Sequence, residues 1–264
     1  MDWIISIKNR PKLIFKSLHY NYKMMSQSLP PDYYNESFSI SIDQRAVFRL
    51  QGYTRPEDQP DERVLELYEH TMEIAQPLLH PRGICSFHKI SEIKDSHIFL
   101  SNSPVLSGKN IARTFRGADI LCVGLVTIGS ELEEQVRLQF QENNLATGLM
   151  LDSIGSEAAE GVAIYLDNHI GQVVKSYGWH RTPRMSPGYG SFDIREQKHI
   201  FTMVDHQRVS VTLTPSCIMV PQKSVSFVIG CGENVRHFDN LSPCRVCDVK
   251  DCPVRDPASA RCQQ

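Results

Sequence analysis

The segment ADILCVGLVTIG, residues 118–129, is a nearly unbroken apolar run and gives the strongest strand signal in the chain. It is shorter than the roughly 18 consecutive apolar residues that a membrane span needs. A strand that is apolar on both sides has to be covered on both sides, so the run predicts a central strand of a buried sheet. A chain of 264 residues, 41% of them hydrophobic, has enough apolar surface to form such a core.

Apolar spacing and turn residues predict the elements around this strand. Helices are expected over residues 62–76, 110–115, 145–175 and 194–204, and from Ser130, which forms a capping box with Glu133, to about Asn143. Strands are expected at 84–90, 97–100, 209–220 and 224–232, and AVFRLQGY (46–53) is interpreted as a strand ending at Gly52. The pattern predicts an α+β fold with a mixed or antiparallel twisted sheet covered by helices.

The expected organisation has three parts. Residues 1–25 are basic and partly apolar, and they are interpreted as a disordered leader or as an upstream start before Met24 or Met25. Residues 26–232 form the α+β domain, and residues 233–264 form a cysteine-rich tail. The apolar run Trp3–Ile7 is too short for a signal peptide, which favours a cytoplasmic protein. A net charge of −2 gives no support for nucleic-acid binding, and no segment predicts a membrane span.

The segment RTPRMSPGYGSFDIREQ, residues 181–197, is a long irregular connection of the kind that often has a function. Arg184 offers a planar fork that can bind a carboxylate through two hydrogen bonds. Pro187 and Gly188 set a turn, and Tyr189 presents an aromatic ring. The loop suits an amino-acid-like ligand with an aromatic or sulfonium portion, but a surface turn with a solvated arginine fits the same residues.

The motif R-x-x-P-G-Y (184–189), a following amphipathic helix and TPSCIMVPQKSVSFVIGCG (214–232) together resemble the activation domain of vitamin B12-dependent methionine synthase. Free-standing versions of that domain are more similar still. The segment DSIGSEAAEGVA (152–163) is also similar to an Ala- and Glu-rich helix of the family. The resemblance is clearest from Val123 to Gly232, weaker from Phe48 to Leu121, and absent before Ser26 and after Gly232.

This resemblance implies S-adenosylmethionine binding beside the cobalamin of a partner protein. Arg184 matches the arginine that binds the methionine carboxylate, and Tyr189 matches the tyrosine that closes the loop. Ser186, Gly188 and Glu157 are the other implied binding residues, although a solvated helix-face glutamate is an equal interpretation of Glu157. The chain departs from the family at Ile229, which stands where a second tyrosine is expected, and it shows no counterpart of an acidic N-terminal ligand.

Four cysteines of the tail, Cys244, Cys247, Cys252 and Cys262, have spacings that allow thiolates to converge on one metal centre. An iron–sulfur cluster is favoured over zinc because the implied chemistry needs a single-electron donor; a structural zinc site and unligated thiols are the alternatives. Cys231 is a possible fifth ligand. Three further cysteines lie in apolar surroundings that predict burial, namely Cys85, Cys122 and Cys217.

The leading hypothesis is a free-standing reactivation protein that binds S-adenosylmethionine, docks on a separate corrinoid-dependent methyltransferase and supports reductive methylation of cob(II)alamin. The tail cluster would deliver electrons, with a flavodoxin or ferredoxin as donor. A metal-tailed adaptor that has lost S-adenosylmethionine binding is the second hypothesis. A self-contained methyltransferase is disfavoured by the absence of a G-x-G-x-x-G loop. The chain also has no D-x-H-x-x-G motif for cobalamin, which favours a partner that supplies the corrin.

Overall fold

The structure, a computed structural model, describes residues 3–6 (backbone only), 29–55, 57–102, 104–238, 242–247 and 249. The strands are β1 (Trp3–Ser6), β2 (Tyr33–Asn35), β3 (Ser39–Ile42), β4 (Arg82–Lys94), β5 (His97–Leu100), β6 (Leu106–Ser107), β7 (Ile120–Thr127), β8 (His180–Arg181), β9 (Thr212–Leu213), β10 (Met219–Val220) and β11 (Ser224–Gly232). The main sheet is antiparallel and has the strand order β6-β5-β4-β7-β11-β8, with β2 also paired to β4.

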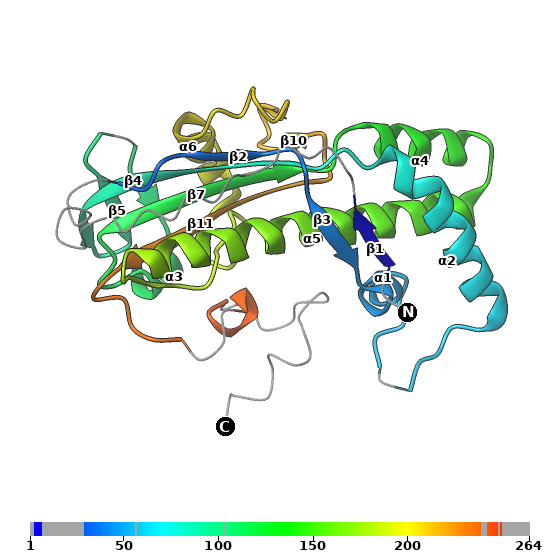
Figure 1. Cartoon of the computed structure of the whole chain (residues 1–264), viewed down its shortest axis with the longest axis horizontal. Helices are drawn as coiled ribbons and strands as arrows, with labels where there is room; N and C mark the ends of the chain where they lie inside the picture. The colour runs from blue at the N-terminus through cyan, green and yellow to red at the C-terminus, as the bar shows by residue number, and fades with distance from the viewer. Residues whose placement is uncertain are drawn as a thin grey trace, which may run out of the picture.

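Helices cover both faces of this sheet. They are α1 (Gln44–Leu50), α2 (Glu62–Ala75), α3 (Lys109–Thr114), α4 (Glu131–Gln141), α5 (Leu145–Ser176) and α6 (Gln197–Met203), with single 3₁₀ turns η2 (Gln76–Leu78), η3 (Ile194–Glu196) and η4 (Pro243–Arg245). The long helix α5 runs along the strands on one face (Figure 1). Side chains of α3 and α6 pack on the other face. The predicted α+β class is confirmed.

Strand β7 is the centre of both packed layers, as its apolar sequence predicts. All eight of its residues are buried. Cys122 and Val126 face the cluster beneath α5, whereas Leu121, Val123 and Leu125 face the cluster beneath α3 and α6. Each fully buried aliphatic side chain contributes about 1.5–3 kcal/mol of hydrophobic free energy. The strand is therefore stabilised from two sides at once.

Helix α5 is continuous for 32 residues, so its small residues do not mark a helix end. They allow close packing, the other interpretation of the sequence. A Cβ at Gly155 would lie 2.6 Å from the Leu132 side chain of α4, and one at Gly161 would lie 3.1 Å from the Ser41 carbonyl oxygen of β3. The small residues therefore let α5 lie close to α4 and β3. The same helix presents acidic side chains to Arg181 of β8 and to Arg184.

The predicted strand at 46–53 is wrong, because these residues lie mainly in helix α1. The Asp43 carboxylate accepts a hydrogen bond from the Arg45 backbone N–H at 2.9 Å and so caps the helix. Ala46, Val47 and Phe48 are buried. The sequence AVFRL offers apolar residues at both helical and strand spacings, and the cap decides in favour of the helix.

The capping box predicted at Ser130 is also wrong, although the helix that follows it is confirmed. Ser130 makes no side-chain capping bond, and its backbone is already helical. The Glu133 carboxylate accepts instead from the backbone N–H of Lys223, just before β11. Glu133 therefore ties α4 to the sheet rather than closing its own helix.

Strand β1, within the predicted leader, pairs antiparallel with β3, so that Trp3 lies opposite Ile42 and Ser6 opposite Ser39. None of the helices in the described ranges combines the length and apolar character needed to cross a bilayer.

Candidate functional site: a buried arginine between α5 and β11

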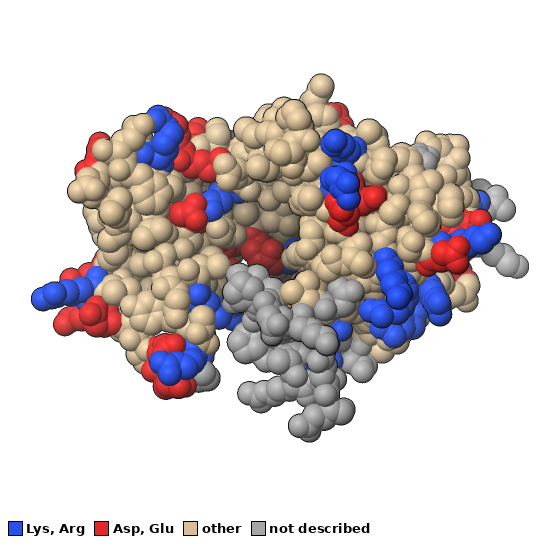
Figure 2. Space-filling model, turned by 180° about the vertical axis from the view of Figure 1, so that it is seen from behind, with Lys and Arg blue, Asp and Glu red and all other residues tan. Residues whose placement is uncertain are grey.

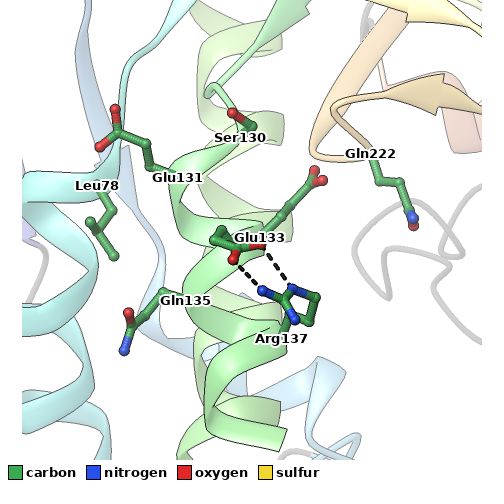
Figure 3. Close-up of a pocket in the computed structure, with 8 residues that line it drawn as sticks. Leu78, Ser130, Glu131, Glu133, Gln135, Arg137 and Gln222 are labelled. Carbon is green, nitrogen blue, oxygen red and sulfur yellow. Dashed lines mark hydrogen bonds and ion pairs between the residues drawn. The ribbon is translucent and has the colours of Figure 1, made fainter. Parts of the chain in front are cut away.

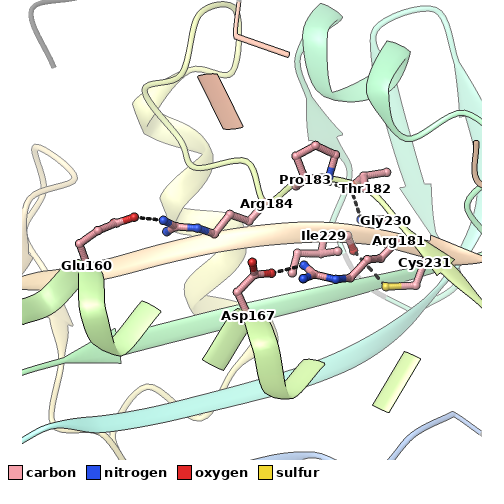
Figure 4. A network of polar contacts seen from close by, with 9 residues as sticks. All are labelled: Glu160, Asp167, Arg181, Thr182, Pro183, Arg184, Ile229, Gly230 and Cys231. Atoms are coloured by element: carbon pink, nitrogen blue, oxygen red, sulfur yellow. Dashed lines mark hydrogen bonds and ion pairs between the residues drawn. The ribbon is translucent and has the colours of Figure 1, made fainter. Parts of the chain in front are cut away.

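The segment that contains Arg184 is fixed along the edge of β11. Thr182 donates its backbone N–H to the Gly230 carbonyl at 2.9 Å, and the Gly230 N–H donates to the Thr182 hydroxyl at 3.0 Å. Met185 and Val228 exchange a pair of backbone bonds of 2.9 and 2.8 Å. These bonds hold the backbone on both sides of Pro183 and Arg184, and the Arg184 side chain points toward α5 (Figure 4).

Arg184 is 5% exposed and has one carboxylate partner, Glu160 of α5. Its guanidinium lies over the Phe227 ring, 5.8 Å from the ring centroid. Burial lowers the pKa of Arg184, and the nearby Tyr189 and Cys244 side chains oppose that shift. The Nη1 atom is buried and has no hydrogen-bond partner among the described residues. A buried cation with an unused donor favours a ligand that brings an anionic oxygen.

A second unused polar atom lies two residues further on, at the Ser186 hydroxyl. It too is buried and has no partner within the described part of the chain. Ser186 begins a tight loop in which the Tyr189 N–H donates to the Ser186 carbonyl at 3.0 Å. Gly188, at a φ of +97°, donates to the Phe192 carbonyl at 2.7 Å. Its positive φ favours glycine at this turn, and Tyr189 is left half-buried at the edge of the cluster that includes Met185.

Two ion pairs fasten this segment to α5, as Figure 4 shows. Glu160 and Asp167 lie seven residues apart on α5 and therefore on one side of the helix. Glu160 pairs with Arg184, and Asp167 pairs with Arg181. Burial raises the pKa of Asp167, and Arg181 counteracts the rise. The Glu160 side chain is 38% exposed, so the Arg184 pair is the one that solvent or a ligand can reach.

Glu157, the acidic residue singled out from the sequence, has different neighbours. Burial raises its pKa from 4.5 to about 7, and the Asp43 carboxylate adds to the rise. The backbone N–H of Asp43 and the charge of Arg49 act in the opposite direction. The structure thus brings Glu157 to the start of α1, whereas Glu160, one turn further along α5, contacts Arg184.

Glu157→Gln is expected to flatten the pH dependence of stability between pH 4.5 and about 7. The folded state holds the Glu157 proton more tightly than the unfolded chain does. The resulting contribution to the free energy of unfolding is complete below pH 4.5 and is lost as the pH rises to about 7. At pH 8 the variant should be more stable by on the order of 1–2 kcal/mol. Urea unfolding at pH 5, 6, 7 and 8 measures this. Glu66→Gln, at an exposed position of α2, is the matched control; equal pH profiles for the two variants would contradict the prediction.

Two contributors to this region were not found from the sequence. Glu160 lies among several acidic residues of α5, and helical periodicity alone does not reveal which one meets the loop. Phe227 was noted only as part of the strand, yet its ring lies beneath the guanidinium. Ile229, at the position of the missing tyrosine, is completely buried in the cluster beneath α5. An aromatic ring is therefore present beside Arg184, two residues earlier in the strand than the resemblance implies.

Only half of the predicted metal site falls within the described residues. Cys244, in the turn η4, and Cys247, two residues after it, are half-buried, and Cys252 and Cys262 lie outside the described ranges. No group of three or more potential metal ligands is gathered in the part of the chain that the structure describes. The metal centre therefore stays a prediction. Cys231, the possible fifth ligand, is completely buried in β11, and burial raises its pKa to about 12.

Thiol labelling of the metal-free native protein should separate the six cysteines within the described residues into two groups. Four are buried, as predicted for the first three, and should resist alkylation until the protein unfolds: Cys85, Cys122, Cys217 and Cys231. Burial also raises the pKa of Cys122. Cys244 and Cys247 should react first. Mass spectrometry of digests after timed iodoacetamide treatment checks this, with urea-unfolded protein as the control; early labelling of Cys122 would contradict it.

A pocket lies away from Arg184, at the start of α4 (Figure 3). It has a volume of about 770 Å³ and is lined by Leu78, Ser130, Glu131, Glu133, Glu134, Gln135, Arg137 and Gln222. Its one arginine is already bound to Glu134 within the same helix. Figure 2, which shows the molecule from behind the view of Figure 1, has a hollow near its middle with acidic side chains in it. We assign the candidate site to Arg184 because its Nη1 atom and the Ser186 hydroxyl are buried and have no hydrogen-bond partner among the described residues.

An antiparallel sheet with a buried arginine at its edge, next to an S-P-G-Y loop, defines an α+β domain with a candidate ligand site. The sequence matches the family described as "Vitamin B12 dependent methionine synthase, activation domain" over residues 110–251, more than half of the chain. The chain belongs to this family, and the resemblance seen in the sequence is confirmed. The match also extends past Gly232, where no resemblance was found in the sequence, and so includes the start of the cysteine tail.

Comparison with solved structures agrees with this fold. A structure described as "Crystal Structure of the MetH Reactivation Domain bound to AdoHcy" matches with a TM-score of 0.55. The alignment has 15% sequence identity and covers 80% of this chain and 81% of that chain. At this identity the match establishes the fold. A search of curated proteins gave no match.

Proposed function

We propose that this protein binds S-adenosylmethionine at Arg184 and supports reductive methylation of cob(II)alamin on a separate corrinoid-dependent methyltransferase. The observation that carries the proposal is the pair of buried polar atoms without partners in the described residues, Arg184 Nη1 and Ser186 Oγ. An amino-acid carboxylate is an acceptor for both. Membership of the activation-domain family and the solved relative with bound AdoHcy support the same ligand class.

The residues of the site would position the ligand without acid–base chemistry. Arg184 would bind the carboxylate, Ser186 would add a hydrogen bond, and Tyr189 would close the loop over the ligand. When bound, S-adenosylmethionine supplies an activated methyl group on its sulfonium. Placing a reactive group against a partner is an orientation effect, and a backbone as firmly held as 182–192 suits that role.

Calorimetric titration of the full chain with S-adenosylmethionine and S-adenosylhomocysteine tests the proposal. Binding of either ligand with one site per chain is expected. A second assay follows reduction-dependent methylation of a purified cob(II)alamin protein with and without this chain. Absence of binding to the folded protein would overturn the proposal and leave the adaptor hypothesis.

For the tail, we propose that Cys244, Cys247, Cys252 and Cys262 hold an iron–sulfur cluster that receives electrons from a flavodoxin or ferredoxin. Such a cluster would supply single electrons, which zinc cannot do. Anaerobic purification, an absorption spectrum and iron and zinc analysis distinguish the two. Stoichiometric iron with a broad visible band is expected; colourless protein with stoichiometric zinc would make the tail structural.

A further inference from the structure

Helix α3 and the residues just after it carry a group of positive charges on the exposed side. Lys109, Arg113 and Arg116 are all exposed, and their spacing of four and then three residues places them on one side of the helix. Residues 96–118 contain no aspartate or glutamate. None of the three cations forms an ion pair with a carboxylate among the described residues. A chain with a net charge of −2 therefore gathers three positive charges in one place.

This arrangement does not stabilise the helix. Lys109 is the first residue of α3, where the positive end of the helix dipole repels a cation. Lys109 and Arg113 also repel each other, because side chains four residues apart are neighbours on a helix. Glu196 approaches the start of α3, but its carboxylate accepts from the backbone N–H of Ser107 at 3.1 Å. Positive charge that is kept at a cost in stability is typical of a surface that binds a negatively charged partner.

Hydrogen bonds join α3 to the loop that contains Tyr189. Asn110 is 1% exposed, and its side-chain amide donates to the Tyr189 carbonyl at 2.8 Å. The backbone N–H of Asn110 donates to the Ser191 hydroxyl at 3.0 Å, and that hydroxyl donates to the Asn110 side-chain oxygen at 3.1 Å. A Cβ at Gly108 would lie 3.3 Å from the Cα of Phe192, so the backbones are also in contact. A molecule bound on the exposed side of α3 therefore lies beside the loop of the candidate site.

We infer that the surface formed by Lys109, Arg113 and Arg116 is where the corrinoid protein docks through an acidic patch. This inference rests on the proposed function for the identity of the partner, but not for the negative charge that the surface attracts. In the proposed reaction the corrinoid protein has to reach the ligand beside Tyr189, and α3 is bonded to that loop. Attraction between opposite charges speeds the encounter and orients the partner, and added salt weakens it.

The charge of the surface is tested without the corrinoid protein. The probe is a fluorescent oligo-glutamate peptide, whose anisotropy in low-salt buffer measures binding to the full chain. The α3 variant, with Lys109→Gln, Arg113→Gln and Arg116→Gln, is expected to bind the peptide about tenfold more weakly than the wild type. The matched control loses three exposed cations from other helices, namely Arg45→Gln, Arg63→Gln and Lys175→Gln. It should bind nearly as tightly as the wild type, and equal affinities in the two variants would overturn the inference.

Thermal unfolding shows whether the α3 variant is folded. Its melting temperature should be at least that of the wild type, because the substitutions remove the repulsion between neighbouring cations. A loss of peptide binding in a variant of wild-type stability is therefore a loss of charge and not of fold.

The docking role is tested in the reductive methylation assay with a purified cob(II)alamin protein. In low salt the KM for that protein should rise by about tenfold in the α3 variant but not in the matched control. Added salt should bring the wild type and the α3 variant together. The affinity for S-adenosylmethionine, measured by calorimetry, should be the same in both, because α3 contributes no side chain to Arg184.

The outcomes separate this inference from the proposed function. If S-adenosylmethionine binds and the KM for the cob(II)alamin protein is unchanged, the docking surface is wrong and the proposed function stands. If the α3 variant loses affinity for a flavodoxin alone, the corrinoid protein is the wrong occupant. If S-adenosylmethionine does not bind but the peptide binds at α3, the proposed function fails and the surface for an acidic partner remains.

Discussion

Replacing Arg184 by alanine is expected to weaken S-adenosylmethionine binding by about 100-fold. The substitution removes charge-assisted hydrogen bonds to a carboxylate from a buried position, a loss of about 3 kcal/mol. The fold should change little, because the Glu160 carboxylate left behind is partly exposed and can be hydrated. Calorimetric titration gives the affinity, and thermal unfolding shows whether the variant remains folded.

Two further variants make this result specific. Arg195→Ala removes another arginine from the same stretch of chain, but Arg195 is exposed and paired with Asp193, so the affinity should not change. Arg184→Lys keeps the positive charge but loses the planar fork. Its affinity should lie between those of the other two variants, about tenfold weaker than that of the wild type. Wild-type affinity in a folded Arg184→Ala protein would refute the assignment of the site.

A large loss of stability is expected from a substitution in the middle of the sheet, at Gly124 of β7. Gly124 lies directly opposite Phe227 of β11. A Cβ at Gly124 would meet three atoms of the Phe227 ring at 2.4, 2.6 and 2.9 Å. Gly124→Ala should therefore destabilise the protein by about 2–3 kcal/mol, because the whole ring has to move within a packed layer. The same movement withdraws the ring from the guanidinium of Arg184.

A double-mutant cycle separates this contact from a general intolerance of the strand. Phe227→Leu alone loses packing, but in its presence Gly124→Ala no longer meets a ring. The two free-energy changes from urea unfolding should therefore sum to more than the change in the double variant, with a coupling of about 1–2 kcal/mol. Strict additivity would show that the ring relaxes without cost.

The elements predicted most reliably from the sequence were those with a single periodicity. The run at 118–129 contains β7, and the helix expected over residues 62–76 is α2. The segment at 46–53 failed because its apolar residues suit either a helix or a strand, and a cap at Asp43 decides between them. The spacing of apolar residues alone does not show whether the capping hydrogen bond at Asp43 forms.

For the candidate site, the sequence indicated only the residues that are close together along the chain. Arg184, Ser186 and Tyr189 belong to one short motif, which the resemblance identifies. Glu160 and Phe227 come from α5 and β11, and only the packing of these elements brings them to Arg184. The family match accounts for the motif.

The pairing of Arg184 with Glu160 also limits which molecules the site can accept. An incoming carboxylate has to share the guanidinium with a carboxylate that is already there, and two anions side by side repel each other. A zwitterionic amino-acid end brings its own ammonium group, which can neutralise the resident acid. Simple carboxylic acids, and nucleosides that lack the amino-acid end, should therefore compete poorly even at high cellular concentrations.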